Sequence, residues 1–106
     1  MSMRRAKVFV CNEEAGVLSE VIFQEEYRFD YKEVYAGFPV SLTMPLDQKS
    51  YFFVKFPPFF DGLLPEGYQL EGLLKQGKVD SNDLFSQLML VGNDMVGAVT
   101  VKEIEQ

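Results

Sequence analysis

The sequence predicts an α+β fold in which a small antiparallel or mixed sheet carries two or three short helices on one face. Three observations predict this class. Period-two alternation dominates the N-terminal half, helical patterns follow between residues 58 and 92, and another strand pattern comes last. This order differs from the repeating βαβ order of a parallel sheet. Because 106 residues suit one hydrophobic core, residues 1–106 are expected to form a single domain.

The first three predicted strands are short runs rich in β-branched and aromatic residues. Lys7–Cys11 and Val17–Phe23 are expected to form a hairpin around a polar turn at residues 12–16. In this arrangement Cys11 is a small residue in the core or at a strand edge. Tyr27–Lys32 alternates aromatic and charged residues, which predicts one buried face and one solvated face.

Prolines divide the middle of the chain. The segment Phe38–Pro45 alternates again, and its prolines favour a strand at the edge of the sheet. Tyr51–Val54 is a further strand candidate, which Pro57 and Pro58 must interrupt. Since proline suits the first turn of a helix, a helix is expected from Pro58 to Leu64.

Two weaker patterns flank the last predicted helix. Leu70, Leu73 and Leu74 have the spacing of a narrow apolar stripe on a helix. Gly97–Val101 has the composition of a strand and is the last predicted element.

The helix between these patterns has clearer start and stop signals. Its apolar face extends over residues 84–91. Asp80 or Ser81 is expected to cap the N-terminus, with Asp83 in the first turn. Gly92 is expected to end the helix in a left-handed conformation.

Composition excludes several kinds of chemistry. The chain has no histidine and a single cysteine, so it can form neither a Ser-His-Asp or Cys-His triad nor an internal disulfide. We therefore expect no catalytic residue, no metal and no cofactor. One lone cysteine favours a reducing, cytoplasmic location. No segment approaches the roughly 20 apolar residues of a membrane span.

The charge balance disfavours nucleic acid as a direct partner. Ten Lys+Arg against sixteen Asp+Glu give a net charge of −6. Nucleic-acid binding requires a basic stripe, whereas only Arg4, Arg5 and Lys7 cluster in this sequence. The acidic balance is compatible with a basic protein partner.

Few residues are candidates for a site on their own chemistry. Asp61 and Glu66 can act as an acid–base pair, but a solvated surface explains two such carboxylates more simply. The segment from Tyr51 to Phe60 contains six aromatic residues, most of which are expected in the core. Tyr68 follows a Pro-Glu-Gly turn and is either packed inward or an anchor for a partner's pocket.

Four motifs are familiar in their order and spacing. Phe59–Gly67 reads Phe-Phe-Asp-Gly-Leu-Leu-Pro-Glu-Gly, and Pro39–Leu46 reads Pro-Val-Ser-Leu-Thr-Met-Pro-Leu. The segments Asp83–Leu90 and Gly92–Val99 add a Leu-Phe helix and a Gly-Asn-Asp turn. Together they resemble the N-terminal subdomain of HipA-like serine/threonine kinases, toxins of a bacterial type II toxin–antitoxin family.

The resemblance implies a role without catalysis. In HipA-like kinases a longer C-terminal part supplies the catalytic aspartate and the metal ligands, and these 106 residues are not expected to contain them. A free-standing copy of this subdomain is similar to HipS, the antitoxin of tripartite HipBST systems. The implied function is to bind and neutralise a HipT-like kinase toxin, with a HipB-like DNA-binding protein as the third member.

The resemblance also implies where the partner binds. Its signature segment supplies eight candidate partner-binding residues, which are Phe59, Phe60, Asp61, Leu63, Leu64, Pro65, Glu66 and Tyr68. Tyr68 stands where many family members have tryptophan. Two alternatives stay open, namely a structural N-terminal fragment of a HipA kinase and a scaffold of a kinase–HipB–DNA complex that does not inhibit. A small enzyme is the class we favour least.

Overall fold

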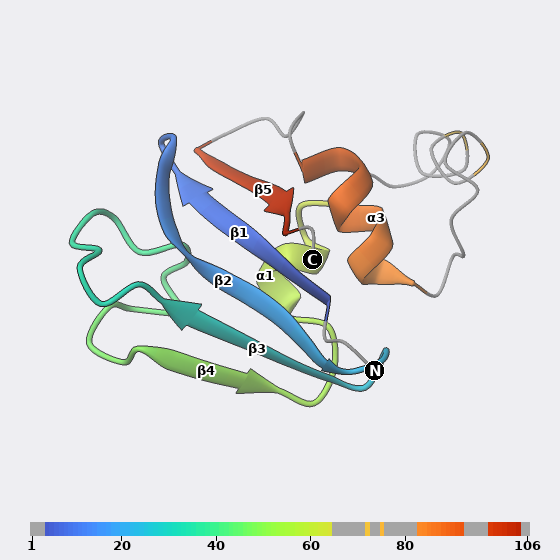
Figure 1. Cartoon of the computed structure of the whole chain (residues 1–106), viewed down its shortest axis with the longest axis horizontal. Helices are drawn as coiled ribbons and strands as arrows, with labels where there is room; N and C mark the ends of the chain where they lie inside the picture. The colour runs from blue at the N-terminus through green and yellow to red at the C-terminus, as the bar shows by residue number, and fades with distance from the viewer. Residues whose placement is uncertain (1–3, 65–71, 73–74, 76–82, 93–97, 105–106) are drawn as a thin grey trace.

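The computed structural model describes residues 4–64, 72, 75, 83–92 and 98–104. Within these residues, five antiparallel strands form a sheet in the order β4-β3-β2-β1-β5 (Figure 1). The elements are β1 (Arg4–Val10), β2 (Glu13–Ile22), β3 (Glu26–Tyr31), β4 (Ser50–Phe53), α1 (Pro58–Asp61), α3 (Leu84–Val91) and β5 (Val99–Glu103). The predicted α+β class is confirmed, with an antiparallel sheet.

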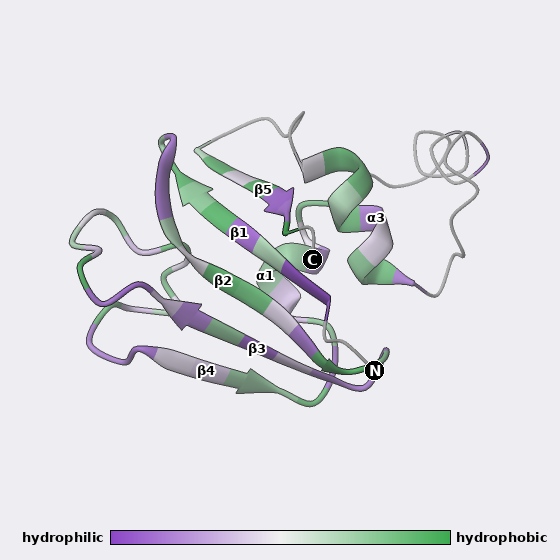
Figure 2. Cartoon of the chain, in the orientation of Figure 1, coloured by the Kyte–Doolittle hydropathy of each residue, from purple (hydrophilic) through white to green (hydrophobic). Residues whose placement is uncertain are grey.

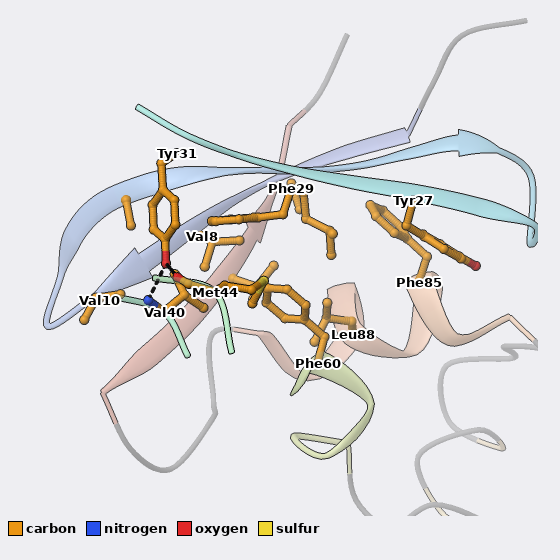
Figure 3. Close-up of a cluster of buried hydrophobic side chains, with 14 of the residues drawn as sticks. Val8, Val10, Tyr27, Phe29, Tyr31, Val40, Met44, Phe60, Phe85 and Leu88 are labelled. Carbon is orange, nitrogen blue, oxygen red and sulfur yellow. Dashed lines mark hydrogen bonds between the residues drawn. The ribbon is translucent and has the colours of Figure 1, made fainter. Parts of the chain in front are cut away.

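The hydrophobic core lies between one face of the sheet and the helices. Figure 3 shows the strands on one side of the core side chains and helices α1 and α3 on the other. Val8 and Phe29 point inward from the sheet, Phe60 from α1, and Phe85 and Leu88 from α3, and all five are fully buried. The alternation of β3 thus buries one face of the sheet as predicted.

The first hairpin turns at Cys11 and Asn12. Val10 pairs with Glu13, so only two residues form the loop, and both have positive φ, 50° and 68°. Such a turn matches the twist of the flanking strands, and asparagine tolerates its left-handed backbone. The expected strand position of Cys11 is therefore wrong, because its side chain is exposed at the turn. Strand β2 correspondingly begins at Glu13.

The segment Phe38–Pro45 does not form the predicted strand. Its only strand-like pairing is an isolated bridge between Ser41 and Met44. The hydroxyl of Tyr31 instead accepts a hydrogen bond from the Val40 amide, at 2.8 Å, and donates one to the Met44 carbonyl. These contacts hold residues 40–44 as a loop over the core, and two prolines without N–H groups favour this outcome.

Helix α1 is shorter than expected and begins where the sequence predicts. Pro58 occupies the start of the helix, and Gly62 is its C-cap. Leu63 and Leu64 continue as a tight turn, since their amides donate to the carbonyls of Phe60 and Asp61 at 3.1 Å. The helix was predicted to extend to Leu64 but ends at Asp61, so the predicted helix is about one turn too long.

Helix α3 differs from the prediction at both ends. Asp83 is itself the N-cap, and its carboxylate accepts a hydrogen bond from the Ser86 amide. The predicted caps Asp80 and Ser81 lie outside the described residues. Gly92 keeps a right-handed conformation, with φ −55°. The predicted left-handed conformation of Gly92 is therefore wrong. A close contact with a neighbouring strand explains why this position is a glycine.

A close approach between α3 and β5 requires a residue without a side chain. A Cβ atom on Gly92 would lie 2.2 Å from the carbonyl oxygen of Val101. The predicted stripe of Leu70, Leu73 and Leu74 falls outside the described residues. Among the elements that the structure does describe, no helix is long and apolar enough to cross a membrane.

Candidate partner-binding surface

The eight predicted partner-binding residues divide into three groups. Phe60 is completely buried and Leu64 is nearly so, with an exposed fraction of 9%. Phe59 and Leu63 are half-buried and Asp61 is exposed. Pro65, Glu66 and Tyr68 lie outside the described residues. Of the described candidates, only Phe59, Asp61 and Leu63 present side-chain surface to a partner.

Phe60 and Leu64 belong to the core rather than to the surface. Figure 3 shows Phe60 pointing from α1 toward the sheet, beside Met44 and Leu88. Its ring centroid lies 6.2 Å from that of Phe29 and 5.3 Å from that of Phe59. Phe60 thereby fixes the position of Phe59, which remains partly accessible on the same short helix.

Phe59 lines an apolar groove of about 220 Å³. The groove combines side chains from the loop after β3, from β4 and from the start of α1; they are Thr43, Met44, Tyr51, Phe53, Pro57, Pro58 and Phe59. Sequence reasoning missed most of these residues. The period of β4 places Tyr51 and Phe53 on one face, but their closeness to Met44 follows from the fold.

Tyrosine hydroxyls fix the loop that forms one wall of this groove, which we call the motif groove. Tyr31 binds the backbone of Val40 and Met44, and the Tyr51 hydroxyl donates to the Pro45 carbonyl at 2.6 Å. Burial raises the pKa of Tyr31, so its hydroxyl stays protonated and keeps both bonds. The groove wall therefore has a defined position without being part of a strand.

Exposed apolar side chains stand next to the motif groove. Leu42 precedes Thr43 and is 95% exposed, and Val54 follows Phe53 and is 87% exposed. Large accessible apolar side chains beside an apolar groove are typical of a protein-binding surface. The charged neighbours are few, with Asp61 exposed on α1 and Lys55 exposed between β4 and α1.

A separate charged cluster joins α3 to the sheet. The Arg4 guanidinium donates to Glu20 at 2.6 and 2.8 Å, to Asp83 at 2.9 Å and to the Ser86 hydroxyl at 2.7 Å. Its Cζ atom also lies 5.0 Å from the ring centroids of Phe23 and Phe85. The Arg4 guanidinium is thus bound by groups of this chain on β2 and α3.

The pKa values of this cluster follow from burial and hydrogen bonding. Burial alone lowers the pKa of Arg4, but its bonds to Glu20 and Asp83 outweigh that effect and raise it. Burial raises the pKa of Asp83, but hydrogen bonds from Arg4 and Ser86 have the larger effect, so the pKa of Asp83 is lowered overall. Both groups stay charged at neutral pH, so the cluster fastens α3 in place.

The described residues do not assemble a catalytic or metal-binding arrangement. No group of three or more His, Cys, Asp or Glu side chains able to hold a metal occurs in the described part of the chain. Asp61 is exposed on the surface, and Glu66, its proposed partner in acid–base chemistry, lies outside the described residues. What the surface offers is an apolar groove with a structured wall.

Comparison with known proteins is decisive for the family. The model of the HipA N-terminal domain matches residues 6–102, which is nearly the whole chain. The chain belongs to the HipA N-terminal domain family. The predicted resemblance to that domain is confirmed.

Two relatives of this HipA N-terminal domain show how far the likeness extends. A protein of Haemophilus influenzae, described as uncharacterized, is 33% identical over 104 residues, which cover 98% of this chain and 96% of that protein. Among solved structures, an N-terminal domain of HipA toxin is similar with a TM-score of 0.78 and 30% identity. The match covers 100% of this chain and 97% of that chain.

In this HipA N-terminal domain, two of the sequence motifs meet in space. Thr43 and Met44, from the motif at residues 39–46, face Phe59, from the motif at residues 59–67, across the motif groove. The intervening strand β4 supplies the floor through Tyr51 and Phe53. Residues that are separate in sequence therefore form one continuous surface.

Proposed function

We propose that this chain is a non-catalytic antitoxin that binds and neutralises a HipA-like serine/threonine kinase toxin in the cytoplasm. The observation that carries the proposal is the match, along its full length, to an N-terminal domain of HipA toxin. In HipA-like kinases the groups that position Mg·ATP belong to a longer C-terminal part. This domain would act by binding, as HipS does in HipBST systems.

We assign one surface of this chain to kinase binding. It comprises the motif groove and the segment from Phe59 to Tyr68. Phe59 and Leu63 supply apolar area, and Asp61 supplies a charge at its margin. The groove, at about 220 Å³, suits one or two apolar side chains of a partner. Tyr68 would enter the nucleotide cleft of the kinase as an aromatic anchor.

Neutralisation is tested by seeking a HipA-like kinase gene beside the gene for this chain and co-expressing the two proteins. We expect growth to be rescued and both proteins, with a HipB-like DNA-binding protein where one is encoded, to co-purify. Loss of rescue together with loss of co-purification would overturn the proposal. An in-frame kinase continuation of this gene would instead identify the chain as a structural fragment.

Kinase autophosphorylation distinguishes inhibition from scaffolding. Added purified antitoxin should suppress autophosphorylation in a concentration-dependent way. Stable binding without suppression would replace the antitoxin by a scaffold that tightens a kinase–HipB–DNA complex. Turnover of a substrate by the purified chain alone, lost on Asp61→Asn, would contradict the absence of catalysis.

Three variants locate the surface. Tyr68→Ala should weaken kinase binding by about 2 kcal/mol if Tyr68 is an anchor. Phe59→Ala should also weaken binding, whereas Phe52→Ala should not, because Phe52 is 72% exposed and lies on the opposite face of the sheet. Affinity is measured by calorimetry, and unfolding in urea confirms that each variant is folded.

A further inference from the structure

The face of the sheet that the helices leave open is basic, although the chain as a whole is acidic. The register brings Arg5 and Lys7 of β1 to this face together with Lys102 of β5. Arg28 of β3 lies on the same face and forms an ion pair with Asp30 there. In Figure 2 the hydrophilic parts of β1 and β5 lie side by side. Residues that are distant in sequence thus form a basic patch, which cannot be recognised from the order of charged residues along the chain.

The centre of this patch is a pair of lysines. Lys7 and Lys102 are Cα partners on neighbouring antiparallel strands, and Arg5 lies two residues from Lys7 on the same face. Like charges that face each other across a strand pair destabilise a sheet. Lys7 lies 3.5 Å from Glu14. Arg5 and Lys102, by contrast, form no ion pair with any carboxylate that the structure describes.

The patch includes a hollow whose lining is partly charged and partly apolar. Lys7, Phe9, Lys102, Glu103 and Ile104 line a depression of about 500 Å³ beside the outer strand β5. Phe9 is half-buried and pairs with Thr100 of β5, two residues along β1 from the Lys7–Lys102 pair. Lys102 has no ion-pair partner among the described residues, whereas Lys7 is paired with Glu14. The hollow therefore combines positive charge that is only partly compensated with the apolar side chains of Phe9 and Ile104.

We propose that this hollow binds an acidic peptide segment of a partner protein, with carboxylates at Lys7, Lys102 and Arg5 and an apolar side chain on Phe9. The charges of the patch and of such a segment are complementary. Glu14 and Glu103 at the margin, and the overall charge of −6, oppose the continuous phosphates of a nucleic acid. A short acidic segment carries fewer negative charges than a nucleic acid and can end before Glu14 and Glu103, so it meets less of this repulsion.

The test measures binding of a short fluorescein-labelled oligoglutamate peptide by anisotropy, at low and at physiological ionic strength. The variant R5Q/K102Q breaks no ion pair among the described residues and should lower affinity about tenfold. The matched control K49Q/K55Q removes two exposed lysines near β4, with the same change in net charge, and should bind as the wild type does. Thermal melting of R5Q/K102Q should match or exceed that of the wild type, since repulsion is relieved.

Each other outcome overturns the proposal. No binding of the peptide at low ionic strength removes the site. An equal loss of affinity in K49Q/K55Q shows attraction to overall charge rather than to this hollow. Tighter binding of a duplex DNA probe, again lost in R5Q/K102Q, assigns the patch to nucleic acid instead. None of these results depends on the kinase. The inference is therefore tested independently of the proposed function.

Discussion

Arg4, the first residue of strand β1, forms ion pairs with Glu20 of β2 and with Asp83, the N-cap of helix α3. The Glu20 carboxylate that it neutralises is only 2% exposed, and the guanidinium itself is 27% exposed. A buried carboxylate without its cation is far less stable than one that keeps it, because its charge has lost water and gained nothing in return. The two carboxylates of this cluster, on β2 and α3, therefore depend on a single cation.

Replacing Arg4 with methionine should lower the free energy of unfolding by about 3 kcal/mol, because the substitution leaves Glu20 unpaired in the interior. Urea unfolding followed by circular dichroism measures the change. Arg28→Met is the matched control. Its pair with Asp30 joins side chains that are 45% and 32% exposed, so the loss should stay below about 1 kcal/mol. Equal losses in both variants would contradict the role of burial.

Tyr27 should give the protein an alkaline transition. Burial first, and then the charge of Glu20 and its hydrogen bond, raise the pKa of Tyr27 from 10.0 to about 12. The folded state therefore favours the neutral hydroxyl, and this contribution to stability is complete below pH 10 and lost as the pH rises towards 12. Urea midpoints between pH 8 and pH 12 should fall through this window, and Tyr27→Phe should fall less.

At the scale of elements, the contact between α3 and β5 depends on the absence of one side chain. Gly92→Ala places a Cβ atom against the Val101 backbone carbonyl, which cannot move without shifting β5. We expect a loss of about 1–3 kcal/mol in unfolding free energy. Gly62→Ala is the control, since its Cβ would make ordinary contacts at 3.5 Å and its φ is −66°. That variant should be neutral or slightly stabilised.

The stability of the loop that forms a wall of the motif groove should depend on the hydroxyl of Tyr31. Tyr31→Phe leaves the Val40 amide and the Met44 carbonyl without their partner, at an expected cost of about 1–3 kcal/mol. Tyr51→Phe removes an exposed hydrogen bond to Pro45 and should cost less than Tyr31→Phe does. Thermal unfolding measures both. If Tyr31→Phe also weakens kinase binding, the groove wall is part of the interface.

Local pattern predicted most of the elements. The alternation of β3, the apolar face of α3 and the proline that opens α1 each follow from neighbouring residues, and the structure contains all three. Phe38–Pro45 alternates equally well, yet Tyr31 binds its backbone as a loop. Gly92 looked like a left-handed terminator, but it stands there because β5 comes close. Both errors arise from contacts between distant residues.

The candidate surface was less predictable than the fold. The signature segment pointed to Phe59, but nothing local distinguishes Phe59, half-buried at the surface, from Phe60, completely buried. The facing wall at Met44 and the basic patch at Lys7 and Lys102 depend on which strands become neighbours. Pairing across the sheet is a property of the tertiary structure, so one-dimensional patterns do not contain it.

The sheet as a whole should show graded protection of its amides. Strands β1, β2 and β3 have partners on both sides, whereas β4 and β5 each pair with a single strand. Amides of the inner strands should therefore exchange with solvent at least about tenfold more slowly than those of β4. Hydrogen exchange followed by NMR measures this difference. Uniform protection would indicate that the sheet opens only as one unit.

The pairing of β1 with β5 has a consequence for synthesis in the cell. Val10 faces Val99 although about ninety positions separate the two along the chain. During synthesis β1 therefore keeps one edge without a hydrogen-bonding neighbour until the residues of β5 have left the ribosome. A nascent chain in this state offers that edge to any extended polypeptide nearby, so timely release or a chaperone protects it from joining the wrong strand.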